Sequence, residues 1–266
     1  MPADALPRRL FLAATPVAGR ASIAEHELHH ARDVLRLAPG DRLVGLDGRG
    51  GRWPVVVQSV QRGAIAVAVE GEVARDPEPG SADSGEPWIE VAASLPRPGR
   101  AEAMVERLTQ LGVSLVRPVA FERTPPHARS LAGGRLRRLE RVAREACKQA
   151  VRSWVPRIEA ARPVAELWKE DLPTVVLDQA ASVPLAAWLA ARGGPAPGRV
   201  RIVVGPEGGL TSAEAEAARA AGAEAVWLAR RVLRVETAAE LAVGLTAHAA
   251  GPARDARASR PSAGRR

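Results

Sequence analysis

The sequence predicts an α/β protein, in which a parallel sheet covered by helices follows a small β-rich module. Beyond residue 88, strand-like apolar runs alternate with helix-like segments, and this alternation is typical of parallel sheets. Before residue 75 only short strand-like runs occur, separated by turn signals such as Pro39-Gly40-Asp41 and Asp47-Gly48. Residues 75–87 are dense in proline, glycine and acids and have no apolar periodicity, which is typical of a linker.

These observations divide the chain into four segments. We expect a β-rich module over residues 1–74, a linker over 75–87, an α/β domain over 88–251 and a disordered, arginine-rich tail over 252–266. A first strand is expected near Arg8, and further strands of the module around 43–46 and 53–60. In the α/β domain the expected strands are 88–95, 113–119, 174–177, 200–204 and 225–228, and the expected helices are 102–111, 135–151, 212–221 and 238–249.

Two of these helices have start signals. Thr211 with Glu214 three residues later forms a capping box, which predicts a helix start directly after Thr211. Thr237 with Glu240 repeats the arrangement and predicts a second start.

The helix over 135–151 is predicted to carry a basic stripe. At 100° per residue, five cations fall within about 80° of one another. Apolar side chains occupy the other side, so the helix can pack and still present cations to phosphates; a merely solvated face is the alternative. The cations are Arg137, Arg141, Arg144, Lys148 and Arg152, and the apolar residues are Leu139, Ala143, Ala146, Cys147 and Ala150.

Composition favours a folded, basic protein of a reducing compartment. The 266 residues are 46% hydrophobic, which is ample for a core, and the formal net charge of +8 favours polyanionic partners such as nucleic acids. An arginine-rich, alanine-rich chain can also reflect a GC-rich genome. Cys147 is the only cysteine, which excludes a disulfide framework and a thiolate metal cluster. No run of about 18 apolar residues exists, so we expect no membrane span.

Two motifs near the N-terminus resemble functional signals, but their surroundings do not support those functions. Arg8-Arg9-Leu10-Phe11-Leu12 is similar to a twin-arginine export signal, but Pro16 interrupts the apolar stretch and no convincing cleavage region follows. His26-Glu27-Leu28-His29-His30 satisfies a zinc-protease pattern, but the next histidine, His127, lies beyond the linker. We interpret the histidines as a polar surface patch and expect no metal.

Two short loops are the most informative part of the sequence. Gly205-Pro-Glu-Gly-Gly209 follows the apolar run 200–204, and its glycines would allow positive φ and a close approach of backbone to a ligand. Arg231-Val-Leu-Arg-Val-Glu-Thr237 precedes the last helix. Neither loop has the phosphate-binding or dinucleotide-binding glycine pattern, so we expect a ligand held mainly by backbone; a simple glycine turn is the alternative.

Together, Gly205-Pro-Glu-Gly-Gly-Leu210 and Arg231-Val-Leu-Arg-Val-Glu-Thr237 resemble the paired signature of bacterial 16S ribosomal RNA uridine N3-methyltransferases, members of the SPOUT superfamily. The resemblance covers about residues 8 to 250. Further matching positions occur in the family's order: His30, Val34-Leu35-Arg36, Gly40-Asp41, Leu111-Gly112-Val113, Glu122-Arg123, Gln149, Arg152 and Pro156.

The resemblance implies an N-terminal PUA-like RNA-binding β-barrel and a C-terminal SPOUT α/β methyltransferase domain with a deep trefoil knot. General topology rules alone would argue against a knot, because threaded chains are rare. The resemblance also implies S-adenosylmethionine as the methyl donor and 16S ribosomal RNA, within the 30S subunit, as the substrate. A cytoplasmic homodimer is implied, with the RNA site completed across the subunits.

The resemblance also implies site residues. Uracil N3 carries a proton at neutral pH, so its methylation needs proton removal or stabilisation of an anion. Arg234 and Arg123 are candidates for stabilising charge on uracil, and Glu236 or Glu207 for accepting the proton; alternatively, Glu236 caps its helix and Glu207 orders its loop. The implied cofactor-binding residues are Leu177, Gly205, Pro206, Glu207, Gly208, Gly209, Leu228, Val232, Leu233, Arg234 and Thr237. The implied RNA-binding residues are Arg8, Arg9, His30, Arg36 and Arg152.

Some positions depart from the family pattern. Lys148 stands where the family usually has an acid, and Gln110 where it usually has glutamate. Both cofactor loops are intact, so activity is still predicted. Two alternatives stay open: a catalytically silent RNA-binding protein, and another SPOUT enzyme that methylates a transfer RNA ribose 2′-oxygen or guanine N1.

Overall fold

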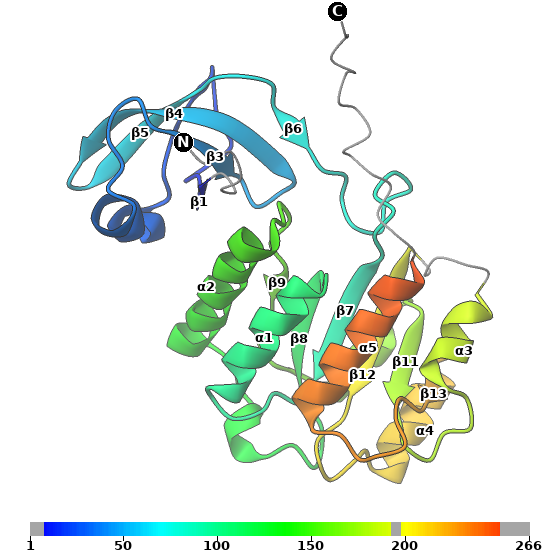
Figure 1. Cartoon of the computed structure of the whole chain (residues 1–266). Coiled ribbons are helices and arrows are strands. Elements are labelled where there is room, and N and C mark those ends of the chain that lie inside the picture. Colours follow the sequence, from blue (N-terminus) through cyan, green and yellow to red (C-terminus); the bar gives the residue numbers. More distant parts are fainter. Residues whose placement is uncertain (1–7, 193–197, 251–266) are drawn as a thin grey trace, which may run out of the picture. The chain divides into compact units, whose positions relative to one another are not determined.

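The computed structural model describes residues 8–192 and 198–250, which form two compact units (Figure 1). Unit 1 contains the chain up to Glu78 and also Cys147–Val155, whereas unit 2 contains Pro79–Ala146 and the chain from Pro156 onward. The division after Glu78 falls within the segment 75–87 that we expected to be a linker. Our sequence analysis did not anticipate that 147–155 belongs to unit 1. The expected basic tail, residues 252–266, lies outside the described residues.

Unit 1 is built on a small closed sheet. Its strands are β1 (Arg9–Phe11), β2 (Arg20–Ser22), β3 (Arg42–Leu46), β4 (Gly51–Gln61), β5 (Ala64–Val69) and β6 (Ala74–Arg75). They are ordered β1-β3-β4-β5-β2, with β6 paired to β4. An antiparallel bridge between Leu12 and Ile23, just beyond β1 and β2, joins the two edge strands. The sheet therefore closes into a barrel, as predicted, around side chains such as Leu10 and Val55.

The interpretation of the histidine-rich motif as a polar surface patch holds for His26 and His29, which are exposed, but not for Glu27, which forms a buried ion pair. Glu27 is only 1% exposed, and its carboxylate accepts hydrogen bonds from the Phe11 backbone N–H (3.3 Å) and from Lys148 Nζ (2.9 and 2.8 Å). Glu27 is thus internal rather than part of a surface patch. Nearby, His30–Val34 forms a single π-helical turn, η2. Among the residues that the structure describes, no group of three histidine, cysteine or acidic side chains could hold a metal.

The segment 147–155 is attached to unit 1 by several hydrogen bonds. The Val155 backbone N–H donates to the Gly48 carbonyl (3.1 Å), and Trp154 Nε1 donates to the Asp76 carbonyl (3.0 Å). Ser153 Oγ donates to the Asp76 carboxylate (2.5 Å). Because burying backbone without partners is unfavourable, these bonds make the segment an integral part of unit 1.

Unit 2 contains a fully parallel sheet, which confirms the predicted fold class. Its strands are β7 (Trp88–Ala93), β8 (Leu115–Ala120), β9 (Arg157–Ile158), β10 (Arg162–Pro163), β11 (Thr174–Leu177), β12 (Arg199–Val204) and β13 (Glu224–Val226). The order is β10-β8-β7-β12-β11-β13, and β9 also pairs with β8. Each recorded strand pair is parallel. Strand-to-strand connections through helices produce this arrangement.

Helices cover both faces of this sheet (Figure 1). They are α1 (Arg100–Gln110), α2 (Gly133–Ala150), α3 (Leu185–Ala190), α4 (Ser212–Ala220) and α5 (Val235–Ala249). Buried side chains of α1, α2, α3 and α5 share one core with Ile89 and Ile202, whereas α4 and the 3-10 helix η4 (Val164–Lys169) pack on the other face with Val203. Our sequence analysis had not predicted α3. None of the helices in the described ranges is long and apolar enough to cross a membrane.

The basic stripe on α2 is shorter than predicted. Arg137 and Arg141 are exposed as expected. Lys148, however, is bound to Glu27. The helix ends at Ala150, where Val151 takes a left-handed φ of 59°, so the chain turns and Arg152 is no longer at helical spacing.

The start of α5 also differs from the prediction. Helix α4 begins after Thr211, which confirms that capping box. The N-cap of α5 is Arg234, with extended φ and ψ of −68° and 156°, so Thr237 lies inside the first turn and does not cap it. Glu240 forms an ion pair with Arg107 instead (2.9 Å). The capping-box prediction for Thr237 was therefore wrong, because Val235 already has helical geometry.

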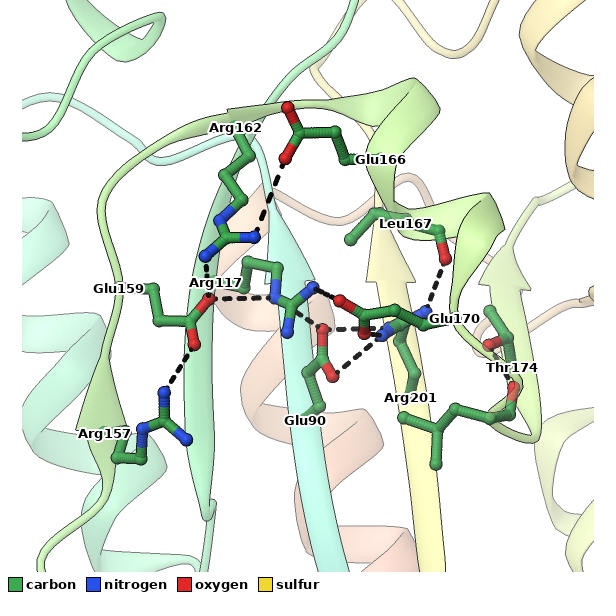
Figure 2. Close-up of polar contacts among 11 residues, drawn as sticks. Glu90, Arg117, Arg157, Glu159, Arg162, Glu166, Leu167, Glu170, Thr174 and Arg201 are labelled. Carbon is green, nitrogen blue, oxygen red and sulfur yellow. Dashed lines mark hydrogen bonds and ion pairs between the residues drawn. The ribbon is translucent and has the colours of Figure 1, made fainter.

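A buried ion-pair network lies across the middle of the unit 2 sheet (Figure 2). Arg201 on β12 is 0% exposed and faces Glu90 on β7, the residue opposite it in the strand register. Arg201 Nε and Nη2 donate to the two Glu90 oxygens (2.9 and 3.2 Å), and Nη1 donates to the Leu167 carbonyl (2.8 Å). Glu170 accepts a further hydrogen bond from Arg201.

Arg117 on β8 extends this network. Its Nη1 donates to Glu170 Oε1 (2.6 Å). Arg117 Nε lies 3.1 Å from Glu90 Oε1 and 3.3 Å from Glu159 Oε2 but donates a hydrogen bond to neither oxygen, so these are charge contacts. Two buried arginines are thus surrounded by three glutamates, which compensates the desolvation of each charge.

The network should make unfolding sensitive to acid. Burial acts to raise the pKa of Glu170, but hydrogen bonds and positive charge from Arg117 and Arg201 outweigh it and hold that pKa below its ordinary value of 4.5. A lowered folded-state pKa stabilises the fold above the unfolded-state pKa, and this contribution is lost as pH falls through the folded-state value. We expect the free energy of unfolding to fall below about pH 4.5, and less steeply in Glu170→Gln. Urea denaturation between about pH 3 and pH 6 measures this; equal slopes for both proteins would contradict it.

Candidate functional site

A pocket of about 490 Å³ opens at the carboxyl ends of β11, β12 and β13 in unit 2. Ligands of open α/β sheets bind characteristically at this edge, and the volume lies in the range of small-molecule sites. The walls come from the segments that follow these strands and from α4. Of the residues selected from the sequence, those lining the pocket are Leu177, Gly205, Pro206, Glu207, Gly209, Leu228, Val232 and Leu233.

The glycine loop 205–209 follows β12. Gly209 has a φ of +70°, and its N–H donates to the Pro206 carbonyl (2.8 Å), which closes a tight turn. Gly205 and Gly208 have no positive φ, so that part of our expectation was wrong. Gly205 instead packs closely against Leu210: a Cβ there would come within 2.5 Å of Leu210 Cδ1, so the leucine side chain would have to move. Conformational freedom is therefore required at Gly209, whereas Gly205 leaves room for Leu210.

Contacts from the loop after β8 hold the glycine loop in place, and we call them the latch. Arg123 Nη1 donates to the Gly208 carbonyl (2.7 Å). The Glu122 backbone N–H donates to Glu214 Oε1 (2.8 Å), while Glu214 Oε2 accepts from the Thr211 backbone N–H (2.9 Å). The latch thus consists of residues 122, 123, 208, 211 and 214. It brings Arg123, a sequence candidate for stabilising charge on uracil, to the glycine loop.

The second wall is the loop between β13 and α5. Leu228 and Leu233 are half-buried and line the pocket with apolar surface. Gln179 Nε2 donates to the Arg230 carbonyl (3.4 Å), which connects this loop to the end of β11. Val232 also lines the pocket but is 83% exposed, which is unusual for a valine.

Three predicted cofactor residues lie outside the pocket lining: Gly208, Arg234 and Thr237. Arg234 is the exposed N-cap of α5, and Gly208 packs against the Arg123 side chain. Glu236, a predicted catalytic residue, is 8% exposed, and its two oxygens accept from Arg100 Nε and Nη2 (2.8 Å each). This bidentate pair fixes the start of α5 against the start of α1.

Comparison with known proteins identifies the family. A family model described as an RNA methyltransferase domain matches residues 84–247, and one described as an RNA methyltransferase PUA domain matches residues 23–70. Ribosomal RNA small subunit methyltransferase E of Mycobacterium tuberculosis is 31% identical over 229 residues, covering 81% of each chain. This chain belongs to that RNA methyltransferase family. The Synechocystis methyltransferase E is 30% identical over 223 residues, covering 82% of this chain and 69% of the relative.

Solved structures share the methyltransferase fold. A probable rRNA-methyltransferase from Porphyromonas gingivalis superposes with a TM-score of 0.72 at 27% identity, covering 90% of this chain and 95% of that one. The methyltransferase E of Neisseria gonorrhoeae, solved bound to S-adenosyl methionine, gives a TM-score of 0.73 at 24% identity with the same coverage. The predicted combination of a PUA-like barrel with an α/β methyltransferase domain is confirmed. The trefoil knot stays a prediction.

The five predicted RNA-binding residues of this methyltransferase all lie in unit 1. Arg8 and Arg9 are at the start of β1, and Arg8 Nη1 is 3.9 Å from the Asp41 carboxylate. His30 begins η2, and Arg36 follows it with a left-handed φ of 50°. Arg152 follows the end of α2. Their role in binding RNA stays a prediction.

The methyltransferase pocket also contains polar residues that our sequence analysis missed. These are Asp178, Gln179 and Arg219; Arg231, which opens the second predicted loop, also lines the pocket. Asp178 and Gln179 directly follow the predicted strand 174–177, and polar residues at the carboxyl end of a parallel strand are a usable signal. Arg219, on α4, had no signal of this kind.

Proposed function

We propose that this chain is an S-adenosylmethionine-dependent methyltransferase that methylates uracil N3 of 16S ribosomal RNA in the small ribosomal subunit. One observation carries the proposal. The pocket of this RNA methyltransferase is lined by residues of the same two segments, 205–210 and 231–237, that resemble the uridine N3 signature. Because such a substrate belongs to ribosome assembly, we propose a cytoplasmic location.

The residues of the pocket fit S-adenosylmethionine. Leu228 and Leu233 provide apolar surface suited to adenine, and the turn at Gly209 presents backbone groups. Asp178 and Arg231 carry opposite charges, which suits a ligand with both an ammonium and a carboxylate. When bound, the cofactor supplies an electrophilic methyl group on a sulfonium.

The chain's own side chains must then handle the uracil proton. We propose that Arg123 and Arg234 stabilise negative charge on the uracil oxygens, since both are exposed beside the pocket loops. Arg100 engages both oxygens of Glu236, so we propose that Glu236 positions α5. Glu207, exposed and lining the pocket, is the proposed proton acceptor.

Methylation of purified RNA tests this function. Small subunits from a strain lacking the gene would be incubated with the protein and S-adenosylmethionine, and the digested RNA analysed by mass spectrometry. We expect 3-methyluridine to appear only with the protein. Methylated ribose or 1-methylguanosine in transfer RNA would instead indicate another SPOUT activity. No cofactor binding in calorimetry would indicate a silent RNA-binding protein.

We further propose that the protein is a homodimer. Val232, 83% exposed, and Leu241 on α5, 41% exposed, are large apolar side chains on the surface of unit 2. Burial against a second copy would remove both from water. Light scattering should give twice the chain mass for the wild type and a smaller value for Leu241→Glu. A monomeric wild type would contradict the proposal.

Removal of the Arg123 side chain should weaken cofactor binding. In Arg123→Ala the Gly208 carbonyl loses its charged donor, so the latch loosens. Hydrogen bonds to charged groups contribute about 1.5 kcal/mol or more, which corresponds to about a tenfold higher KM for S-adenosylmethionine. Arg123→Lys, which retains a donor, should lose less. Steady-state kinetics measures both, and a lower kcat with unchanged KM would assign Arg123 to uracil alone.

A further inference from the structure

Many arginines of unit 2 are bound to acids of the same unit. Their guanidinium groups are thereby occupied within the protein. They are Arg100, Arg107, Arg117, Arg138, Arg157, Arg162, Arg192 and Arg201. An exposed arginine without an acidic partner, by contrast, can offer its guanidinium to an external anion.

Three exposed arginines on the loops that follow β7 and β13 have no acidic partner, in addition to Arg234, which we propose acts on uracil. Arg97 lies between β7 and α1, whereas Arg230 and Arg231 lie between β13 and α5. No carboxylate in residues 8–192 or 198–250 forms an ion pair with any of them. Arg231 lines the pocket, whereas Arg97 and Arg230 do not. These three positive charges, like those of Arg219 and Arg234, have no acidic partner among the described residues.

The fold brings these two loops together. Arg100, the first residue of α1, and Glu236, the second of α5, are joined by two hydrogen bonds of 2.8 Å. Arg97 lies three positions before Arg100, and Arg231 lies five before Glu236. Both loops therefore lead into one partly buried ion pair. Ser94, which precedes Arg97, donates its backbone N–H to the Val204 carbonyl (3.2 Å), where the glycine loop begins.

We propose that Arg97 and Arg230 bind the phosphates that flank the target nucleotide, whereas Arg231 in the pocket lining serves the cofactor, so that unit 2 itself holds the RNA backbone beside the pocket. This inference rests on the proposed function and adds a second RNA surface to the one predicted in unit 1. The planar guanidinium matches phosphate geometry in a bidentate manner. Phosphate contacts position a nucleic acid without specifying its sequence. They would therefore fix the RNA while Arg123, Arg234 and Glu207 act on uracil.

Salt-dependent RNA binding tests the inference. The double variant Arg97→Gln/Arg230→Gln leaves the pocket lining intact. Its matched control, Arg157→Gln/Arg192→Gln, loses the same charge from arginines that pair with Glu159 and Glu224. Fluorescence anisotropy with a 16S ribosomal RNA fragment would be recorded between about 50 and 200 mM salt. Losing two phosphate contacts should flatten the slope of log K against log salt by about 1.4 to 1.8.

We expect a flatter slope of log K against log salt in Arg97→Gln/Arg230→Gln and a nearly unchanged slope in the control. Calorimetry should show that both bind S-adenosylmethionine as the wild type does, and thermal melting should show that both are folded. If Arg97→Gln/Arg230→Gln has the same slope as the wild type or the control, the inference is overturned. It is also overturned if this variant loses affinity only for the cofactor. If the wild type methylates no RNA, the proposed function fails instead.

Discussion

Gly209→Val should lower the affinity for S-adenosylmethionine by about tenfold to a hundredfold. The φ of +70° at Gly209 lies in the left-handed region, which a β-branched side chain adopts only with strain. Strain of this kind costs about 1–3 kcal/mol, and the tight turn to Pro206 would open to relieve it. Since space around Gly209 is open, sterics alone would not exclude the side chain. Calorimetry measures the affinity directly.

Gly209→Asn is the matched control. Asparagine tolerates the left-handed region, so this variant should retain much more affinity than valine does. Gly208→Val should have a smaller effect, because a Cβ there lies 3.3 Å from Arg123 Cδ, and that side chain can shift. RNA affinity should be largely unchanged in all three. Wild-type cofactor affinity in Gly209→Val, or an equal loss of RNA affinity, would contradict this account of the loop.

Arg201→Met should destabilise unit 2 by about 3–5 kcal/mol. Removing one partner of a buried ion pair leaves the other charge buried and uncompensated. Glu90 is almost fully buried and would keep only its charge contact with Arg117. For a domain of this size the loss corresponds to a melting temperature lower by about 6–20 °C. Thermal and urea denaturation measure both quantities.

A double variant distinguishes the cost of leaving one charge unpaired from the cost of losing the packing of the Arg201 side chain. In Glu90→Leu/Arg201→Met both charges are replaced by apolar side chains, so the double variant should be more stable than Arg201→Met alone. If both variants lose the same free energy, the packing of the Arg201 side chain matters more than its charge.

Local patterns predicted the sheet, most helices and the pocket loops. The strands 174–177 and 200–204 are uninterrupted or nearly uninterrupted apolar runs, and Thr211 with Glu214 fixes the start of α4 through contacts only three residues apart. Most of the pocket lining could be selected because two loops resemble a known signature. In both cases the deciding information lies within a few neighbouring residues.

Long-range partners could not be predicted in this way. Arg201 sits inside an apolar strand, and its role depends on Glu90, which is 111 residues away in sequence. The sequence placed Lys148 in a basic stripe, but in the structure it binds Glu27, a partner 121 residues away. The start of α5 was misassigned because Thr237 and Glu240 match the capping-box pattern in the sequence. In the structure the helix already begins at Val235, and the hydrogen bonds between Arg100 and Glu236 fix its start.

The membership of 147–155 in unit 1 has a consequence for synthesis on the ribosome. Unit 1 cannot be completed when Glu78 leaves the exit tunnel, because Ser153 and Trp154 still have to bind Asp76. At about 5–20 residues per second, these partners arrive roughly 4–15 s later. During that interval Glu27 has no lysine to neutralise it, so the barrel is expected to gain its full stability only after Lys148 has been synthesised.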